Sequence, residues 1–293
     1  PLDAFGNRPP QLSFEVFRRP GSATGLEERL KGVCLIPGAG EFVYATDAVL
    51  RRDGLTRTTA ENVNNPEGRA DLAVSLDQLQ AQLPAVDHVT LVVSWFGTDL
   101  RCGACQIRPG VDQAFKATTP QVWRAGGVGR EAAHVISLQD GGPAYGGTPS
   151  DACVLQAIAE LKRRGLKVSL YPFVLMDVPP GSGLADPYGA SQQGAYPWRG
   201  RITCHPAPGR PGSPDGGTGA ASQVAAFFGD ATPGQVGQAD GLPTFSGSGW
   251  GFRRMVLHYA RLAALAGGVD GFLIGSELRG LTTVRGAGGT YPA

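Results

Sequence analysis

The sequence contains little charge and almost no imbalance between acidic and basic residues. Only 17% of its 293 residues are Asp, Glu, Lys or Arg, and the formal net charge at pH 7 is +1. Proteins that bind nucleic acid or an anionic membrane through surface charge carry a clear basic excess. Here 22 Arg and four Lys are scattered along the chain. The composition therefore gives no support for a nucleic-acid or membrane partner.

Long apolar runs are missing as well. No stretch of about 18 apolar residues occurs, so no segment is predicted to span a membrane, and no signal peptide opens the chain. Residue 1 is Pro, and the last residues, GGTYPA, are of loop type. We therefore expect the chain to be a piece of a longer polypeptide.

The five cysteines do not form the even, closely spaced set of a secreted disulfide framework. They are Cys34, Cys102, Cys105, Cys153 and Cys204. Cys102 and Cys105 form one CxxC pair, but a zinc site needs a second pair or a nearby His, and none follows at short range. Reduced structural cysteines are the better interpretation, and we expect neither a metal nor a cofactor.

Residues 1–84 are predicted to form a small β-rich segment with one helix. Residues 12–19, LSFEVFRR, alternate apolar and polar side chains as a half-buried strand does, and residues 32–52 contain two more short extended pieces. In residues 71–83, leucines at spacings of three and four predict an amphipathic helix. Apolar residues make up 42% of the chain, and 44 Gly and 23 Pro predict long loops between its elements.

In residues 85–293, apolar strands alternate with helices. A Gly- and Pro-rich insertion at about 178–248, with one short helix near its middle, interrupts this alternation. Thr148 is the predicted N-cap of the first helix of this region, and Gly165 is its predicted end. The expected strands are 88–97, 132–142, 166–177 and 271–278, and the expected helices are 148–165 and 250–268.

This alternation predicts an α/β fold with a parallel sheet. Polar residues stand at three strand ends: Trp95 with Asp99 just after it, Asp177, and Glu277. In a (β/α)8 barrel such ends converge on the face that carries active sites. A doubly wound sheet usually has a Gly-rich turn after its first strand, and WFGTDLRCG lacks one. Because four strands are visible, we expect the N-terminal half of a TIM-like barrel.

Glu277 is the leading candidate for chemistry. A carboxylic acid can protonate a glycosidic oxygen, but it needs a second carboxylate across the sugar, about 5 Å away for retention. Asp177 is a weaker candidate, because it can instead cap the loop that follows its strand. Glu277 itself can be structural, paired with Arg279 or Arg285.

Two stretches resemble a known enzyme class. GFLIGSEL, with YPFVLMD upstream, is similar to the fourth and third strands of clan-A glycoside hydrolases. In that clan the acid/base glutamate ends strand four, so the resemblance implies that Glu277 is the acid/base. The nucleophile of the family lies on its seventh strand and has no counterpart here. We therefore expect this chain to be inactive alone.

A closer resemblance covers nearly the whole chain. Residues 146–180, YPWRGRITCHP and DGFLIGSELRGLTTVR resemble the TIM-barrel-like domain of gene transfer agent proteins. FGNRPPQLSFEVFR, residues 5–18, resembles the N-terminal hub segment of phage-like tail proteins. Residues 1–84 would then be a tail-hub segment, and residues 85–293 the first half of a glycoside-hydrolase-like barrel.

The resemblance implies a structural subunit of a particle that delivers DNA. We expect a baseplate hub subunit at the tail tip, assembled in the bacterial cytoplasm as a homo-oligomeric ring with other tail subunits, with a barrel that binds or cleaves cell-envelope glycan. The alternative is a soluble clan-A-type glycoside hydrolase that uses Glu277 as its acid/base.

Further residues are candidates for sugar contact. Trp95 and Trp198 can act as stacking platforms, since aromatic faces pack on apolar sugar surfaces, although Trp95 is as readily a core residue. Asp99 and Arg199 are weaker candidates, Arg199 as a partner for an anion or a carboxylate. His134 lies inside an apolar stretch and is predicted to be a core histidine.

Overall fold

The computed structural model describes residues 25–36, 38–54 and 56–293. The strand predicted at residues 12–19, and the segment 5–18 that carries the tail-hub resemblance, lie outside the described residues.

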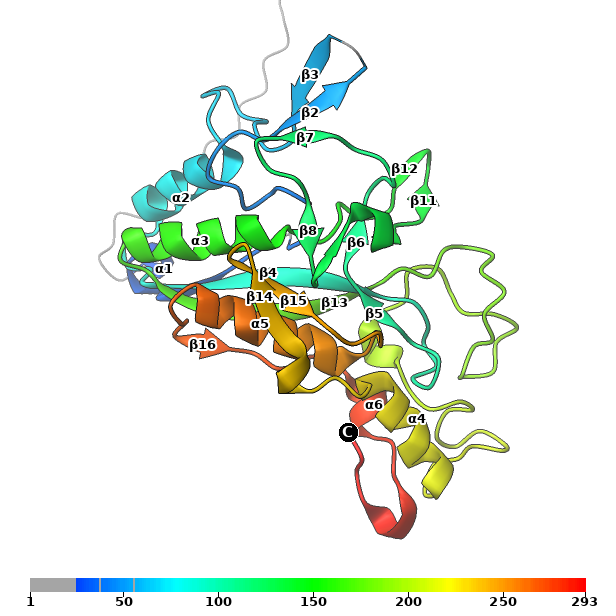
Figure 1. The fold of residues 1–293 in the computed structure, drawn as a ribbon. Coiled ribbons are helices and arrows are strands. Elements are labelled where there is room, and N and C mark those ends of the chain that lie inside the picture. The colour runs from blue at the N-terminus through cyan, green and yellow to red at the C-terminus, as the bar shows by residue number, and fades with distance from the viewer. Residues whose placement is uncertain (1–24, 37, 55) are drawn as a thin grey trace, which may run out of the picture.

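The core of the fold is a parallel sheet whose strands stand in chain order (Figure 1). Its four parallel strands are β1 (Gly32–Leu35), β4 (His88–Gly97), β13 (Lys167–Met176) and β16 (Gly271–Phe272), and the short β5 (Ile107–Arg108) pairs antiparallel with β4. The helices α2 (Asp71–Gln82), α3 (Asp151–Arg163) and α5 (Phe252–Leu265) lie in the three connections. The α/β prediction is confirmed. Among the described residues this sheet does not close into a barrel, and β1 and β16 are its outer strands.

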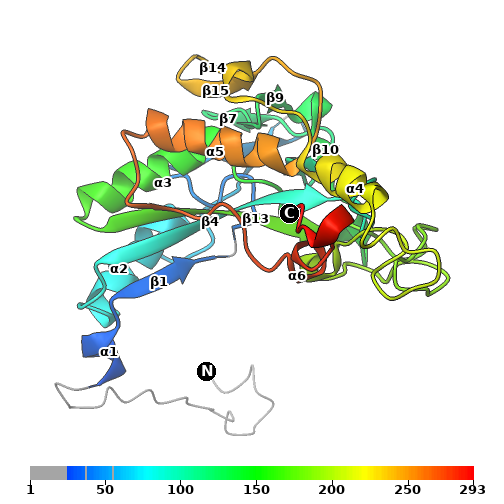
Figure 2. The same cartoon turned by 90° about the horizontal axis from the view of Figure 1, so that it is seen from below.

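One face of the sheet packs against α3 and α5, which lie side by side in Figure 2. Alternate strand residues face these helices because side chains in a strand point to opposite faces with a period of two. Of the other alternate side chains of β13, Tyr171, Phe173 and Leu175 are only partly buried. The core is formed by Val89, Leu91, Val93, Val168, Leu170 and Val174 of the strands with Val154, Ile158, Leu161, Met255, Tyr259 and Leu262 of the helices.

The helices follow the predicted pattern, with one correction at the start of α3. The N-cap of α3 is Ser150, whose side chain accepts a hydrogen bond from Cys153 N at 3.2 Å. Thr148, the predicted N-cap, instead donates to Ser94 O at 2.7 Å and so holds the loop against β4. Beyond the C-terminus of α3, Gly165 has a φ of 77°, the left-handed conformation that ends many helices.

The strand predicted at residues 132–142 is wrong. The Asp140–Gly141 pair forms a hairpin turn, a sequence that favours two-residue turns over a continuous strand. Side chains from this stretch also bind Asp177 instead of packing in the core. The stretch contains a 3-10 turn, η2 (Arg130–Ala132), then β10 (His134–Val135), which pairs with β6 (Gly110–Val111), and the hairpin β11 (Leu138–Gln139) and β12 (Gly142–Pro143).

The Gly- and Pro-rich insertion contains its own small elements. The short helix expected there is the C-terminal part of α4 (Thr218–Phe228), which packs on α5 through stacked rings of Phe227 and Phe252. The other elements are the 3-10 turns η3 (Arg199–Arg201) and η4 (Pro233–Gln235) and the hairpin β14 (Val236–Ala239) and β15 (Leu242–Phe245).

Residues within the predicted 1–84 segment take part in two different sheets. β1 lies in the main sheet, so that sheet crosses the expected boundary at residue 84. A separate small sheet joins β2 (Leu50–Asp53), β3 (Arg57–Ala60) and β7 (Thr118–Thr119). The remaining short elements are α1 (Leu26–Arg29), β8 (Arg124–Ala125), β9 (Val128–Gly129), α6 (Arg279–Thr282) and η5 (Ala287–Gly289).

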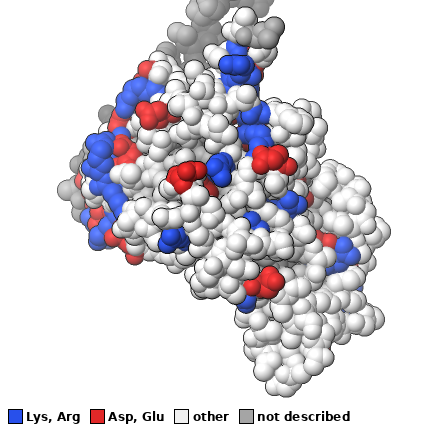
Figure 3. All heavy atoms as spheres, viewed as in Figure 1, with Lys and Arg blue, Asp and Glu red and all other residues white. Residues whose placement is uncertain are grey.

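Charged side chains of both signs are interspersed on the face viewed in Figure 3. Of the helices that the structure describes, none has the length and apolar character needed to cross a bilayer.

Candidate functional site

The candidate site lies where β16 runs out at the carboxyl end of the sheet. The chain continues from Phe272 alongside β13, with Leu273 N donating to Leu170 O at 3.0 Å, and reaches Glu277 just before α6. Because parallel strands end at the same edge of a sheet, Glu277 stands near the ends of β13 and β4, where the sequence predicts a site.

Glu277 is held by two residues of the insertion, and both had been predicted as sugar contacts. The indole Nε1 of Trp198 donates to Glu277 Oε2 at 2.6 Å. Arg199 Nη2 lies 3.1 Å from the same oxygen. About half of the Glu277 side chain (53%) and of Trp198 (49%) remains exposed. The arrangement fixes the carboxylate and leaves both it and the indole ring open to a ligand.

Arg199 is the anchor that fastens this cluster to the sheet. Its guanidinium lies 3.5 Å from the centroid of the Phe173 ring on β13, a cation–π contact. It also donates to Ser276 O at 3.3 Å and to Ser276 Oγ at 3.2 Å. The Ser276 hydroxyl in turn hydrogen-bonds the Tyr171 hydroxyl of β13. Arg199 is buried, so its charge is fully committed to these partners.

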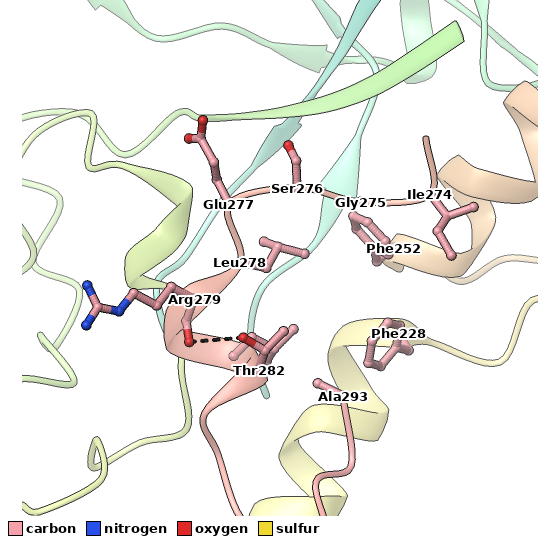
Figure 4. Close-up of a pocket in the computed structure, with 11 residues that line it drawn as sticks. Phe228, Phe252, Ile274, Gly275, Ser276, Glu277, Leu278, Arg279, Thr282 and Ala293 are labelled. Carbon is pink, nitrogen blue, oxygen red and sulfur yellow. Dashed lines mark hydrogen bonds between the residues drawn. The ribbon is translucent and has the colours of Figure 1, made fainter. Parts of the chain in front are cut away.

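A pocket of about 500 Å³ opens beside Glu277 (Figure 4). In Figure 4 the Glu277 carboxylate points away from the rings of Phe228 and Phe252. The pocket is therefore apolar on the side of α4 and α5 and polar at its Glu277 end. Its other lining residues are Ile274, Gly275, Ser276, Leu278, Arg279, Leu281, Thr282 and Ala293.

Backbone strain marks the same region. Four described residues other than glycine have positive φ: Asp140, Tyr196, Asp240 and Glu277. The two aspartates precede glycines in hairpin turns, where this conformation is ordinary. Tyr196 (φ 45°) and Glu277 (φ 54°) have no such turn, and strain of this kind gathers at ligand-binding sites. The short segment from Tyr196 to Arg199 links the two strained residues.

Asp177, at the end of β13, is buried and fully engaged. It accepts hydrogen bonds from His134 Nε2 at 2.6 Å, from Ser137 N at 3.0 Å and from the Ser137 hydroxyl. Burial alone would raise the pKa of Asp177, but the hydrogen bonds from His134 and Ser137 outweigh it and hold that pKa below its ordinary value. His134 was predicted to be a core residue, yet 21% of its side chain is exposed. Its partner at the strand end was missed, because nothing in the sequence pairs these distant positions.

Asp99 is also committed within the fold. It forms an ion pair with Arg101, whose Nη2 lies 2.6 Å from Asp99 Oδ2, and it accepts from Gln193 Nε2 at 2.7 Å. The hydrogen bond to Asp99 raises the pKa of Arg101. Asp99 thus ties the loop after β4 to the insertion, and its burial leaves no edge for a ligand.

Trp95 is fully buried, which argues against the predicted role as a sugar platform. Its ring packs against Trp250, His258 and Tyr259, with centroids 5.5–6.0 Å apart. The apolar character of 88–97 is the sequence signal that favours this core position.

The alternative partners considered for Glu277 are not the ones it uses. Arg285 pairs with Asp215, with Nη2 and Oδ2 2.5 Å apart. Glu277 pairs with Arg199, a long-range contact that no local sequence pattern predicts.

One carboxylate cluster elsewhere has the spacing of a metal site. Oxygen atoms of Glu41, Glu61 and Asp112 lie within 4.8 Å of one another. The buried ammonium of Lys116 lies 2.5–3.2 Å from an oxygen of each, and Arg130 adds a second cation at Glu41. The position of a metal is therefore already filled by a lysine.

Part of the chain matches a known family model. Residues 250–293, which include all of α5 and end at Ala293, match the family model of the GTA TIM-barrel-like domain, where GTA denotes gene transfer agent. The matched segment contains Glu277 and much of the pocket beside it. No curated protein matches the chain. The match relates this part of the chain to gene transfer agent proteins.

Proposed function

We propose that this chain belongs to a structural component of the baseplate hub of a gene transfer agent's phage-like tail, and that Trp198, Arg199 and Glu277 form its contact with cell-envelope glycan. The observation that carries the glycan assignment is the hydrogen bond of 2.6 Å from Trp198 Nε1 to Glu277 Oε2, between two half-exposed side chains. The family match at residues 250–293 supports the link to a gene transfer agent.

The chemistry of the cluster suits a sugar ring. An exposed indole offers an apolar face on which a pyranose can stack. A carboxylate whose second oxygen is already bound keeps its first oxygen for a sugar hydroxyl. Because Trp198 is held by Glu277, little side-chain entropy is lost when a ligand binds.

The second candidate function is glycan hydrolysis with Glu277 as acid/base. Its position after the fourth strand and its exposure favour this role. The other strand-end carboxylates, Asp99 and Asp177, are both buried and hydrogen-bonded, so neither can serve as the second carboxylate that the reaction requires. We therefore predict that this chain alone does not turn over glycan. Turnover that disappears in Glu277→Gln would reverse that conclusion.

A place in a ring of tail subunits is part of the proposal. A parallel sheet is normally covered on both faces, whereas Tyr171 and Phe173 on β13 are partly exposed. Among the described residues, β1 and β16 each leave one strand edge unpaired, and such edges favour a covering partner. These features support further protein against this sheet, and the tail tip supplies such neighbours.

The hub assignment is tested by peptide-resolved mass spectrometry on purified tail particles. We expect peptides from residues 5–18 and 271–285 at one fixed, low stoichiometry relative to the major tail protein. Their absence from particles, with recovery in the soluble fraction, would reject the hub role and leave the free hydrolase to be tested.

A further inference from the structure

A histidine and a carboxylate form an oriented pair just after the end of β13. His134 Nε2 lies 2.6 Å from Asp177 Oδ2, and the Asp177 side chain is only 1% exposed. A carboxylate accepts hydrogen bonds, so the Nε2 that faces it must carry the proton. In the neutral imidazole, the other ring nitrogen, Nδ1, is then a lone-pair acceptor. In the described part of the chain Nδ1 has no hydrogen-bond partner, and it is not among the buried unpaired atoms. It therefore reaches solvent.

The chain offers its own comparison for this geometry. His258 Nε2 and Asp151 Oδ1 form the same kind of pair at 2.8 Å, but both side chains are at most 5% exposed. The His258 ring packs against Trp95 and Tyr259. That pair joins α5 to α3 and cannot meet a ligand. The pair at His134 differs because part of the His134 side chain is exposed to solvent.

The surroundings of His134 connect it to the glycan cluster. The Ser137 hydroxyl donates to Asp177, and its oxygen also lies 3.2 Å from the Tyr196 hydroxyl oxygen. The Tyr196 ring packs edge-on against Tyr145 at 5.8 Å. Two residues later in the chain, Trp198 binds Glu277. The strained segment from Tyr196 to Trp198 thus runs from the end of β13 to the end of β16.

We propose that His134 is a second ligand-binding group at this edge of the sheet, that its Nδ1 accepts a hydrogen bond from a glycan hydroxyl, and that Asp177 is the positioning residue that fixes its tautomer. The ligand class rests on the proposed function, whereas the tautomer does not. The imidazole acts as an acceptor with a preset direction, and Trp198 stacks on a neighbouring part of the same ligand.

Long-range ¹H–¹⁵N spectra of the whole chain test the tautomer without any ligand, since they report which ring nitrogen carries the proton. We expect His134 to carry it on Nε2, and Asp177→Leu, which leaves no acceptor at this position, to remove this preference, whereas the His258 signals stay unchanged. A proton on Nδ1 in the unmodified chain, or the same His134 spectrum in Asp177→Leu, would overturn the proposal.

The ligand is tested by titration with soluble glycan strands released from bacterial peptidoglycan. We expect the His134 Nδ1 and Trp198 indole signals to shift together and His258 to stay fixed. His134→Lys keeps a donor for Asp177 and has no acceptor in its side chain, so affinity should fall about fivefold to tenfold, the value of one hydrogen bond. Shifts at Trp198 without His134 would refute the inference alone. No shift at either residue would contradict the proposed function and this ligand together.

Discussion

Trp198 and Glu277 are 79 positions apart in the chain, and a hydrogen bond of 2.6 Å joins the indole Nε1 of one to the carboxylate of the other. This contact brings an exposed aromatic ring and an exposed carboxylate to the same strand end. It depends on Arg199, which is buried against Phe173 and reaches the same carboxylate.

Backbone strain at Glu277 predicts an unusual order of stability. Glu277→Gly and Glu277→Ala both remove the carboxylate, so they differ mainly in the cost of a φ of 54°. Glycine adopts this conformation freely, whereas a Cβ costs about 1 kcal/mol. We expect urea unfolding to give a free energy about 1 kcal/mol higher for the glycine variant. At Glu160, inside α3, the same two substitutions should give the opposite order, and alanine as the more stable residue at both positions would contradict the assigned strain.

Arg199 should matter for stability as well as for binding. Arg199→Met removes the contact with Phe173 and the hydrogen bonds to Ser276 and Glu277. Because the guanidinium is buried, we expect a loss of about 2 kcal/mol in the free energy of unfolding, measured by chemical denaturation. The matched control is Arg201→Met. Its side chain is half exposed, so its loss should stay below about 1 kcal/mol. Equal losses would show that Arg199 is not an anchor.

Asp177 should give a pH-dependent contribution to stability. Its pKa is lowered in the folded chain, so its contribution is complete above the ordinary carboxyl pKa of about 4 and is lost as the pH falls below it. Asp177→Asn should cost about 2 kcal/mol at pH 7, and the gap to the unmodified chain should narrow as the pH falls below about 4. Asp240→Asn, at an exposed turn, should show no gap. A gap that is constant with pH would mean that Asp177 is not charged in the folded chain.

Much of the scaffold follows from sequence pattern, because its signals are local. Leucine spacing predicts α2, and the continuous apolar runs predict β4 and β13 closely. The strand prediction at 132–142 was wrong because apolar composition does not distinguish one core strand from two short strands that pair around a turn. β1 was seen only as an extended piece, since its place in the main sheet depends on pairing with His88–Leu91.

The individual residues of the candidate site could be predicted from the sequence, but the contacts between them could not. Glu277, Trp198 and Arg199 each stand out from their local context, yet their contact depends on how the insertion returns to the sheet. The role of Trp95 was ambiguous because the local sequence around an aromatic residue in an apolar strand is the same whether the ring packs in the core or stacks on a sugar. His134 was assigned to the core because its partner, Asp177, lies 43 positions away.

The most direct test of the glycan site is co-sedimentation of this chain with purified bacterial cell-wall sacculi, comparing the unmodified chain, Trp198→Ala and Phe115→Ala. Phe115 is 92% exposed and lies outside the cluster, so its variant controls for the loss of any exposed aromatic ring. We expect the unmodified chain and Phe115→Ala to pellet with sacculi. Trp198→Ala should bind sacculi with an affinity at least tenfold lower and stay mostly in the supernatant, while its free energy of unfolding is unchanged. Equal pelleting of Trp198→Ala and the unmodified chain, or no pelleting of either, would contradict a glycan site at Trp198 and Glu277.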